Sequence, residues 1–310
     1  ASMDPIPESP EPSGREVEPP LARKLTEVER SWLLTSGALL AFALAFGFAL
    51  SQFDVMSEPG ERDFGAAAGD AQIEVYIQPT QIDPLNYSMQ FRLSTQPKRS
   101  NGEMVNAVAD RDLVLTVKRG NETDNVQIRL NQPYPELNLA TDLDGGGVRY
   151  YPLDRYAAEI SMALVDPSQV QPGKSLPFHV KTWEGVLGWQ VQAQPLALRD
   201  PGAVGVRLLA QRTGATAFFG LALYGAMVVM AVCAMAIGTL VFVGIRRIEV
   251  TLIGAVGAMV FALPALRNAM PGNPPVGVRG DVFVFFWAEL ATVTALSMFV
   301  IAWARRGTKP

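Results

Sequence analysis

The sequence predicts a membrane protein with four transmembrane helices and an all-β, sandwich-like domain between the first helix and the other three. Two observations support this prediction. Four apolar stretches together hold 92 of the 310 residues and contain one charged side chain, Glu289. The long segment between the first two stretches alternates apolar and polar residues, which is typical of strands that bury one face. The apolar stretches exclude a wholly soluble protein, and a single cysteine excludes a disulfide scaffold.

The four apolar stretches are expected to be helices, because roughly 20 apolar residues cross the ~30 Å hydrocarbon layer of a bilayer. They cover residues 31–53, 217–245, 250–266 and 282–304. The third stretch has only 17 residues, and a buried or re-entrant segment is the alternative there. The first stretch is expected to be a signal anchor rather than a cleaved signal peptide, since its apolar run is long.

Basic residues near the ends of the spans predict the orientation, because Lys and Arg favour the cytoplasmic side. With four spans, eight basic residues fall on one side: Arg23, Lys24, Arg30, Arg246, Arg247, Arg305, Arg306 and Lys309. We therefore expect an inner- or plasma-membrane protein with both termini in the cytoplasm and residues 54–216 outside it. Residues 1–30, rich in proline and acids, are expected to form a disordered cytoplasmic tail, and residues 305–310 a second, short tail.

The extracytoplasmic segment, residues 54–216, contains strand signals throughout. Its alternating runs lie at residues 73–77, 87–93, 113–117, 126–130, 160–162, 176–180, 189–193 and 204–208. Proline- and glycine-rich turns separate these runs. Alternation with one polar face predicts antiparallel sheets, and eight such strands predict a β-sandwich.

The chain offers few residues for catalysis. Its one histidine, His179, lies in an alternating run at a position that predicts a solvent-facing side chain, and Cys233 lies within a span. Common nucleotide-binding, metalloprotease and hydrolase motifs are absent. We therefore expect no catalytic residue, no metal site and no cofactor, and a hydrolase built on paired carboxylates is only a third hypothesis. The net charge of −4 argues against nucleic-acid binding.

The first candidate site for a ligand or partner is the segment Tyr151-Pro152-Leu153-Asp154-Arg155-Tyr156. Pro152 restricts the backbone, and Asp154 can accept hydrogen bonds from nearby amides. Tyr151 and Tyr156 can pack while their hydroxyls stay in water. These properties favour a rigid structural corner over a ligand site.

The second candidate site is the loop of residues 267–281, which contains three prolines and three glycines. Asp281 is expected to cap the fourth membrane helix. Glu289 lies about 12 Å deeper in the membrane, and either Arg267 or Arg279 is the expected partner of its carboxylate. Glu289 is then either a structural acid that joins helices or a proton or cation site.

These two segments resemble an uncharacterised family of bacterial and fungal membrane proteins. Residues 151–156 resemble its aromatic-Pro-Phe-Asp-x-Tyr signature, with Leu153 where Phe is usual. The family's loop before the last helix is matched by Arg267, Met270, Pro271, Gly272, Pro274, Pro275, Gly277, Asp281 and Trp287. The resemblance covers about residues 30–305. It implies one leading span, an extracytoplasmic domain and three trailing spans, and it implies no activity.

Two functional hypotheses follow. In the first, the chain is a non-enzymatic accessory or scaffold protein that presents its β domain to a partner or a larger envelope complex. Its protein contacts would form through the transmembrane helices or the β domain, and membrane lipids would surround the spans. In the alternative, the chain is a lipid- or ion-handling membrane protein that uses Glu289 and the 267–281 loop.

Overall fold

The computed structural model describes residues 27–55, 60–66, 71–97, 99–100, 103–104, 108–168, 175–200 and 202–306. The chain divides into two compact units, Ala1–Phe48 and Ala49–Pro310. The first unit holds most of helix α1 (Glu27–Val55), whose apolar stretch covers Thr35–Phe48. The predicted tail over residues 1–30 lies almost entirely outside the described residues.

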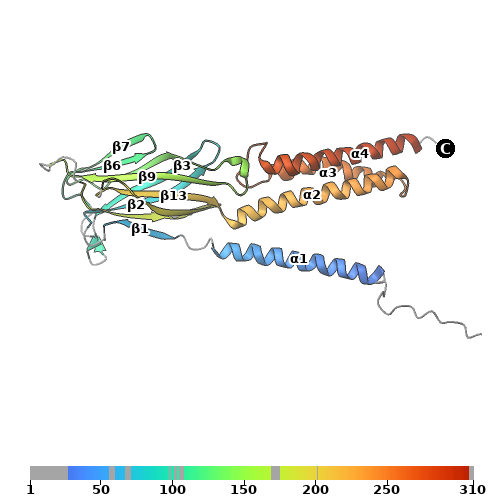
Figure 1. Cartoon of the computed structure of the whole chain (residues 1–310), viewed down its shortest axis with the longest axis horizontal. Coiled ribbons are helices and arrows are strands. Elements are labelled where there is room, and N and C mark those ends of the chain that lie inside the picture. The colour runs from blue at the N-terminus through green and yellow to red at the C-terminus, as the bar shows by residue number, and fades with distance from the viewer. Residues whose placement is uncertain are drawn as a thin grey trace, which may run out of the picture. The chain divides into compact units, whose positions relative to one another are not determined.

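The second unit begins with a region rich in strands, which confirms the predicted β character of this part of the chain (Figure 1). A five-stranded sheet has the order β1 (Glu61–Gly65), β10 (His179–Trp183), β2 (Ile73–Asp83), β3 (Ser88–Pro97) and β8 (Glu136–Asp142). A six-stranded sheet has the order β11 (Gly185–Val186), β12 (Trp189–Leu196), β13 (Val204–Arg212), β9 (Arg155–Val165), β6 (Leu113–Arg119) and β7 (Glu122–Ile128). The short strands β4 (Arg99–Ser100) and β5 (Glu103–Met104) pair with each other.

The two large sheets share one hydrophobic core, to which every second residue of the inner strands contributes. Phe91 of β3 and Ile160 of β9 are among its fully buried side chains. The pairing of β10 with β2 is parallel, so the expectation of purely antiparallel sheets is wrong. Only a short hairpin forces neighbouring strands to run antiparallel, and about 100 residues separate β2 from β10.

The expectation that His179 faces solvent is also wrong, because its side chain is buried. Its strand β10 lies between β1 and β2, and Gly65 of β1 pairs opposite His179 without a side chain of its own. The imidazole Nδ1 lies 2.9 Å from the carbonyl oxygen of Ala66, and Nε2 lies 3.3 Å from Asp63 Oδ1. The chain next to β10 therefore buries His179, although the alternation of the strand alone predicts an exposed side chain at this position.

Three helices of the described residues are long and apolar enough to cross a membrane. They are α2 (Gly214–Val243), α3 (Val250–Asn268) and the helix of residues 281–306, in which a π-helical turn η2 (Asp281–Phe285) precedes α4 (Phe286–Arg306). Figure 1 shows them side by side, beyond the end of β13. The Thr213 side chain accepts a hydrogen bond from Thr216 N and so caps α2 directly after that strand.

Small residues allow α2 and α4 to approach each other closely. A Cβ atom added to Gly238 would lie 3.0 Å from both Cα and Cβ of Ala295 on α4. A Cβ added to Gly225, on the same helix, would meet no atom of the described chain within 4 Å.

We therefore predict that Gly238→Val destabilises the helix bundle and that Gly225→Val does not. Both changes alter the helix propensity of α2 equally, so the difference isolates the crowding against Ala295, which costs about 1–3 kcal/mol. The measurement is thermal unfolding of the full chain in detergent, followed by intrinsic tryptophan fluorescence. Equal unfolding temperatures for the two variants would contradict the packing of α2 on α4.

Candidate functional site

The two candidate segments, residues 151–156 and 267–281, meet where the β domain joins the helices. The ring of Tyr151 is 2% exposed, although it belongs to the chain between β8 and β9. Its hydroxyl oxygen lies 3.1 Å, and Pro152 Cβ 3.2 Å, from the position that a Cβ on Gly220 of α2 would occupy. Tyr151 packs in one buried cluster with residues of the helices and their loop: Tyr224, Met227, Ala231, Leu263, Met270, Val278 and Ala288. A side chain of the β domain thus forms part of the core of the helix bundle.

On the β-domain side of Tyr151 lies a buried ion pair between Asp154 and Arg212. Arg212 Nε donates to Asp154 Oδ1 at 2.7 Å, and the Tyr156 hydroxyl donates to Oδ2 at 3.1 Å. The Arg212 guanidinium carbon lies 4.8 Å from the ring centre of Tyr151 and 4.5 Å from that of Trp189. A charge pair this deeply buried contributes only with good geometry, and removing one partner is costly.

On the helix side of Tyr151 lies a second buried ion pair, between Arg267 and Asp281. Arg267 Nε and Nη2 donate to the two oxygens of Asp281 at 3.2 and 2.8 Å, and Nη2 also donates to the carbonyl oxygen of Pro275 at 2.8 Å. Asp281 accepts further bonds from Gly277 N at 2.9 Å and from the Tyr224 hydroxyl at 3.1 Å. The pair therefore closes the loop over the ends of α2, α3 and α4.

The expectation that Asp281 caps the fourth helix is wrong in its detail. Arg279 and Gly280 are already helical, and Asp281 follows them as the first residue of η2. The Asp281 carboxylate binds Arg267 and the preceding loop instead of the free amides of its own helix. A charged donor from α3 competes successfully with neutral amides for this carboxylate.

Two further contacts join the 267–281 loop to the β domain. Gly272 has a φ of +77°, a conformation that favours glycine, and a Cβ there would lie 2.6 Å from Arg212 Nη1. The exposed guanidinium of Arg279 lies 4.2 Å from the ring centre of Tyr150. The loop thus contacts both the end of β13 and the residue before Tyr151.

The expected partnership of Glu289 with Arg267 or Arg279 is wrong. Arg267 binds Asp281, which lies closer to it along the loop, and Arg279 stacks on Tyr150. Glu289 Oε2 is buried and has no hydrogen-bond partner among the described residues. Among the described residues, Glu289 Oε2 is the one buried carboxylate oxygen that has no hydrogen-bond partner.

Arg212 was not among the predicted site residues, although Arg212 binds Asp154 and contacts the rings of Tyr151 and Trp189. A signal was present in the pattern of β13. The residues at positions 204, 206, 208 and 210 are apolar and buried, so the same alternation puts Arg212 on the core face. An arginine at an inward position directly before a membrane helix indicates a buried acid nearby.

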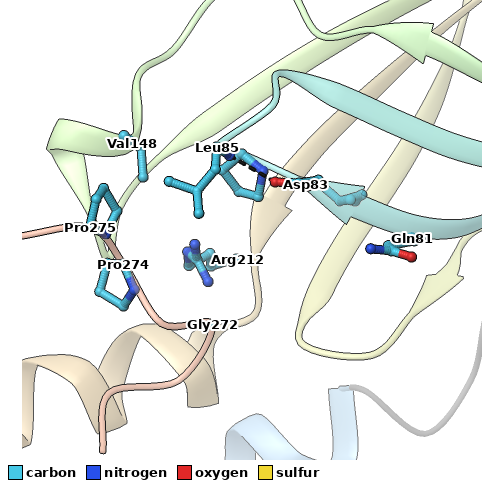
Figure 2. Close-up of a pocket in the computed structure, with 10 residues that line it drawn as sticks. Gln81, Asp83, Leu85, Val148, Arg212, Gly272, Pro274 and Pro275 are labelled. Carbon is cyan, nitrogen blue, oxygen red and sulfur yellow. Dashed lines mark hydrogen bonds between the residues drawn. The ribbon is translucent and has the colours of Figure 1, made fainter. Parts of the chain in front are cut away.

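A pocket of about 190 Å³ lies against this junction (Figure 2). It is lined by Arg212, Gly272, Pro274 and Pro275, and from the β domain by Gln81, Ile82, Asp83, Pro84, Leu85 and Val148. Hydrogen bonds from Asn86, chiefly from its side-chain amide, lower the pKa of Asp83 from its usual value. The described residues include no cluster of His, Cys, Asp and Glu that could hold a metal ion.

Comparisons with known proteins match the two parts of the chain separately. Residues 62–208 match a family model described as "Domain of unknown function (DUF4436)". Residues 212–306 match a second model, "Domain of unknown function (DUF8686)". The chain thus combines segments similar to two domain families of unknown function. No curated protein matches it. The boundary between the two matches falls at the end of β13, next to Arg212.

Removal of the hydroxyl group from Tyr151 and from Tyr156 is expected to change the free energy of unfolding differently. The Tyr151 hydroxyl is buried and has no hydrogen-bond partner in the described part of the chain, whereas the Tyr156 hydroxyl donates to Asp154. We predict that Tyr151→Phe leaves the free energy of unfolding unchanged or raises it. Tyr156→Phe is expected to lower it by about 1–3 kcal/mol, because Asp154 then loses a donor.

The burial of Tyr151 also predicts how the stability of the protein depends on pH. Burial, the largest cause, raises the pKa of Tyr151 from 10.0 to about 12. Between these two values the unfolded chain loses this proton first, so stability falls as the pH rises from about 10 towards 12. Tyr151→Phe should make thermal unfolding less sensitive to pH in that window. An unchanged pH dependence, or a larger loss of stability than in Tyr156→Phe, would contradict the burial of Tyr151 in the bundle.

Proposed function

We propose that the chain is an integral membrane accessory or scaffold protein that presents its β domain, a sandwich of two sheets, to a protein partner or a larger membrane complex. The observation that carries this proposal is the insertion of Tyr151 between the helices, flanked by two buried ion pairs. A β domain attached in this way keeps a fixed orientation at the membrane. Fixed orientation is what a presenting domain needs, because an ordered interface costs less entropy on binding.

The proposed topology has α1 as a first span and α2, α3 and α4 as the other three, with both termini in the cytoplasm. Basic residues after α2 and at the end of α4 support this orientation. The β domain then lies outside the cytoplasm, next to the bilayer. Its last strand runs into α2 with one residue, Thr213, between them, which keeps the domain at the membrane surface.

The pockets that the structure describes fit a binding role better than hydrolysis. The pocket at the junction has one carboxylate among its lining residues, Asp83, and a second pocket beside β2 and β10 also has one, Glu61. Hydrolysis by paired carboxylates needs two such groups on one substrate. Neither of these two pockets therefore offers the carboxylate pair that such a hydrolase needs.

Loosening the junction should weaken partner binding. We predict that Arg212→Gln reduces partner recovery several-fold, because it leaves Asp154 buried without its cation. Arg207→Gln, on the exposed face of the same strand, should have no effect, since its pair with Glu159 is half exposed. The measurement is native mass spectrometry of the full chain extracted in polymer-bounded native membrane discs. A wild-type chain at 33.5 kDa under all conditions would contradict the proposal.

A second function, handling of protons or cations in the membrane, is favoured by one observation. Glu289 lies in α4, and its buried Oε2 atom has no partner in the described residues. Acids inside a membrane are costly and are often retained for transport.

Under this second function, Glu289→Gln should abolish a proton or cation flux without lowering the unfolding temperature. The control is Glu249→Gln, an exposed acid directly before α3. The flux is measured with the purified chain in liposomes that contain a pH-sensitive dye. An equal flux in all three proteins, or no flux above empty liposomes, would exclude this role for Glu289.

A further inference from the structure

Arg212 has hydrogen-bond donors that its own ion pair does not use. Its side chain is 4% exposed, and Nε donates to Asp154, whose second oxygen accepts from Tyr156. The hydrogen bond to Asp154 is made by Nε, which leaves the Nη1 and Nη2 groups outside the ion pair. Arg267 differs, because its Nη2 binds both Asp281 and the Pro275 carbonyl. Arg212 lines the neighbouring pocket, so its Nη1 and Nη2 groups can donate to a molecule bound there.

The neighbouring space is the pocket of about 190 Å³ at the junction. Figure 2 shows the Arg212 guanidinium in its middle, between Leu85 and Pro274. The rings of Tyr151 and Trp189 hold the guanidinium in place. One water molecule takes up about 30 Å³, so the pocket has room for a group of several heavy atoms.

The position of the pocket along α2 indicates which acceptor is at hand. The 30 residues of α2 are about 45 Å long, which equals the thickness of a bilayer with its headgroup layers. Arg212 lies two residues before α2 and therefore at the level of the lipid headgroups. Phosphate groups are the abundant acceptors at that level, and the planar fork of a guanidinium matches their geometry.

Asp83 adds a negative charge to the same pocket. Its Oδ1 accepts from the backbone N–H groups of Leu85 and Asn86, and Oδ2 accepts from Asn86 Nδ2. These bonds, chiefly the one from the Asn86 side chain, lower the pKa of Asp83 and fix the carboxylate at the turn after β2. A ligand with only negative charge is repelled by Asp83, whereas a ligand with a phosphate and a separate cation satisfies both side chains.

We propose that this pocket binds the headgroup of a zwitterionic phospholipid, with its phosphate on Arg212 and its ammonium group towards Asp83. This site goes beyond the scaffold role, since it does not require a protein partner. Lipid bound here would contact the β domain and the 267–281 loop at once, because Gly272 and Pro274 line the same pocket.

The test is native mass spectrometry of the full chain in detergent with added phosphatidylethanolamine or phosphatidylglycerol at equal concentration. The wild-type chain should retain phosphatidylethanolamine about tenfold better, because only this lipid offers a cation to Asp83. Asp83→Asn keeps an acceptor oxygen for the turn and should bring the two lipids to about equal binding. Inorganic phosphate at the same concentration should displace neither lipid.

Two further variants separate binding in the pocket from general contact with detergent or lipid. Leu85→Trp fills the pocket without touching the Arg212 ion pair and should reduce binding of phosphatidylethanolamine about tenfold. Leu130→Trp, at an exposed leucine that does not line the pocket, should leave binding unchanged. Equal binding of both lipids by the wild-type chain, unchanged selectivity in Asp83→Asn, or unchanged binding in Leu85→Trp would overturn the proposal. Displacement by inorganic phosphate would equally overturn it, since a free anion would then suffice.

Discussion

The burial of Tyr151 in the helix bundle is the contact on which the arrangement of the second unit depends. One aromatic ring from the β domain fills space between α2 and the loop after α3, and Gly220 leaves the room for it. Burial of such a ring stabilises the structure by about 2–3 kcal/mol. This apolar contact joins two domains that are otherwise continuous through a single connection, at Thr213.

The charged residues around Tyr151 fit the same constraint. Near a membrane, a charged side chain that has left water needs a partner, and each of the two arginines beside Tyr151 has a buried aspartate. Asp154 orders the chain on one side of the ring, and Asp281 orders the loop on the other. Asp281 binds Arg267 through Nε and Nη2, and Glu289 has neither arginine as its partner. Asp154 binds Arg212 through Nε alone, and Arg212 also lines the pocket.

Much of this fold follows from local pattern, and much of the site does not. Alternation located eight of the eleven strands that the structure describes in the two large sheets and missed β1, β8 and β11. Apolar length located α2, α3 and α4, and both signals depend on which residues leave water. The segments around Tyr151 and Asp281 were each predicted to matter, but about 130 residues separate them and only tertiary packing brings them together. Tertiary packing also explains why two other predictions were wrong. His179 is buried by the neighbouring chain, and the arginine expected to bind Glu289 binds the nearer Asp281. Arg212 differs from these, because the alternation of β13 continues to it on the core face, although the predicted run ended at residue 208.

The most direct test of this account is the distance between the β domain and the helices in a bilayer, measured by pulsed electron paramagnetic resonance. Spin labels at two exposed positions, Thr123 on β7 and Trp303 on α4, report it in a Cys233→Ser background. We expect one narrow distance distribution in the otherwise wild-type chain and in Leu153→Ala, whose side chain is exposed, and a broad distribution in Tyr151→Ala. A narrow distribution that persists in Tyr151→Ala, or a broad one in the unmodified junction, would contradict the claim that Tyr151 fixes the β domain on the helices.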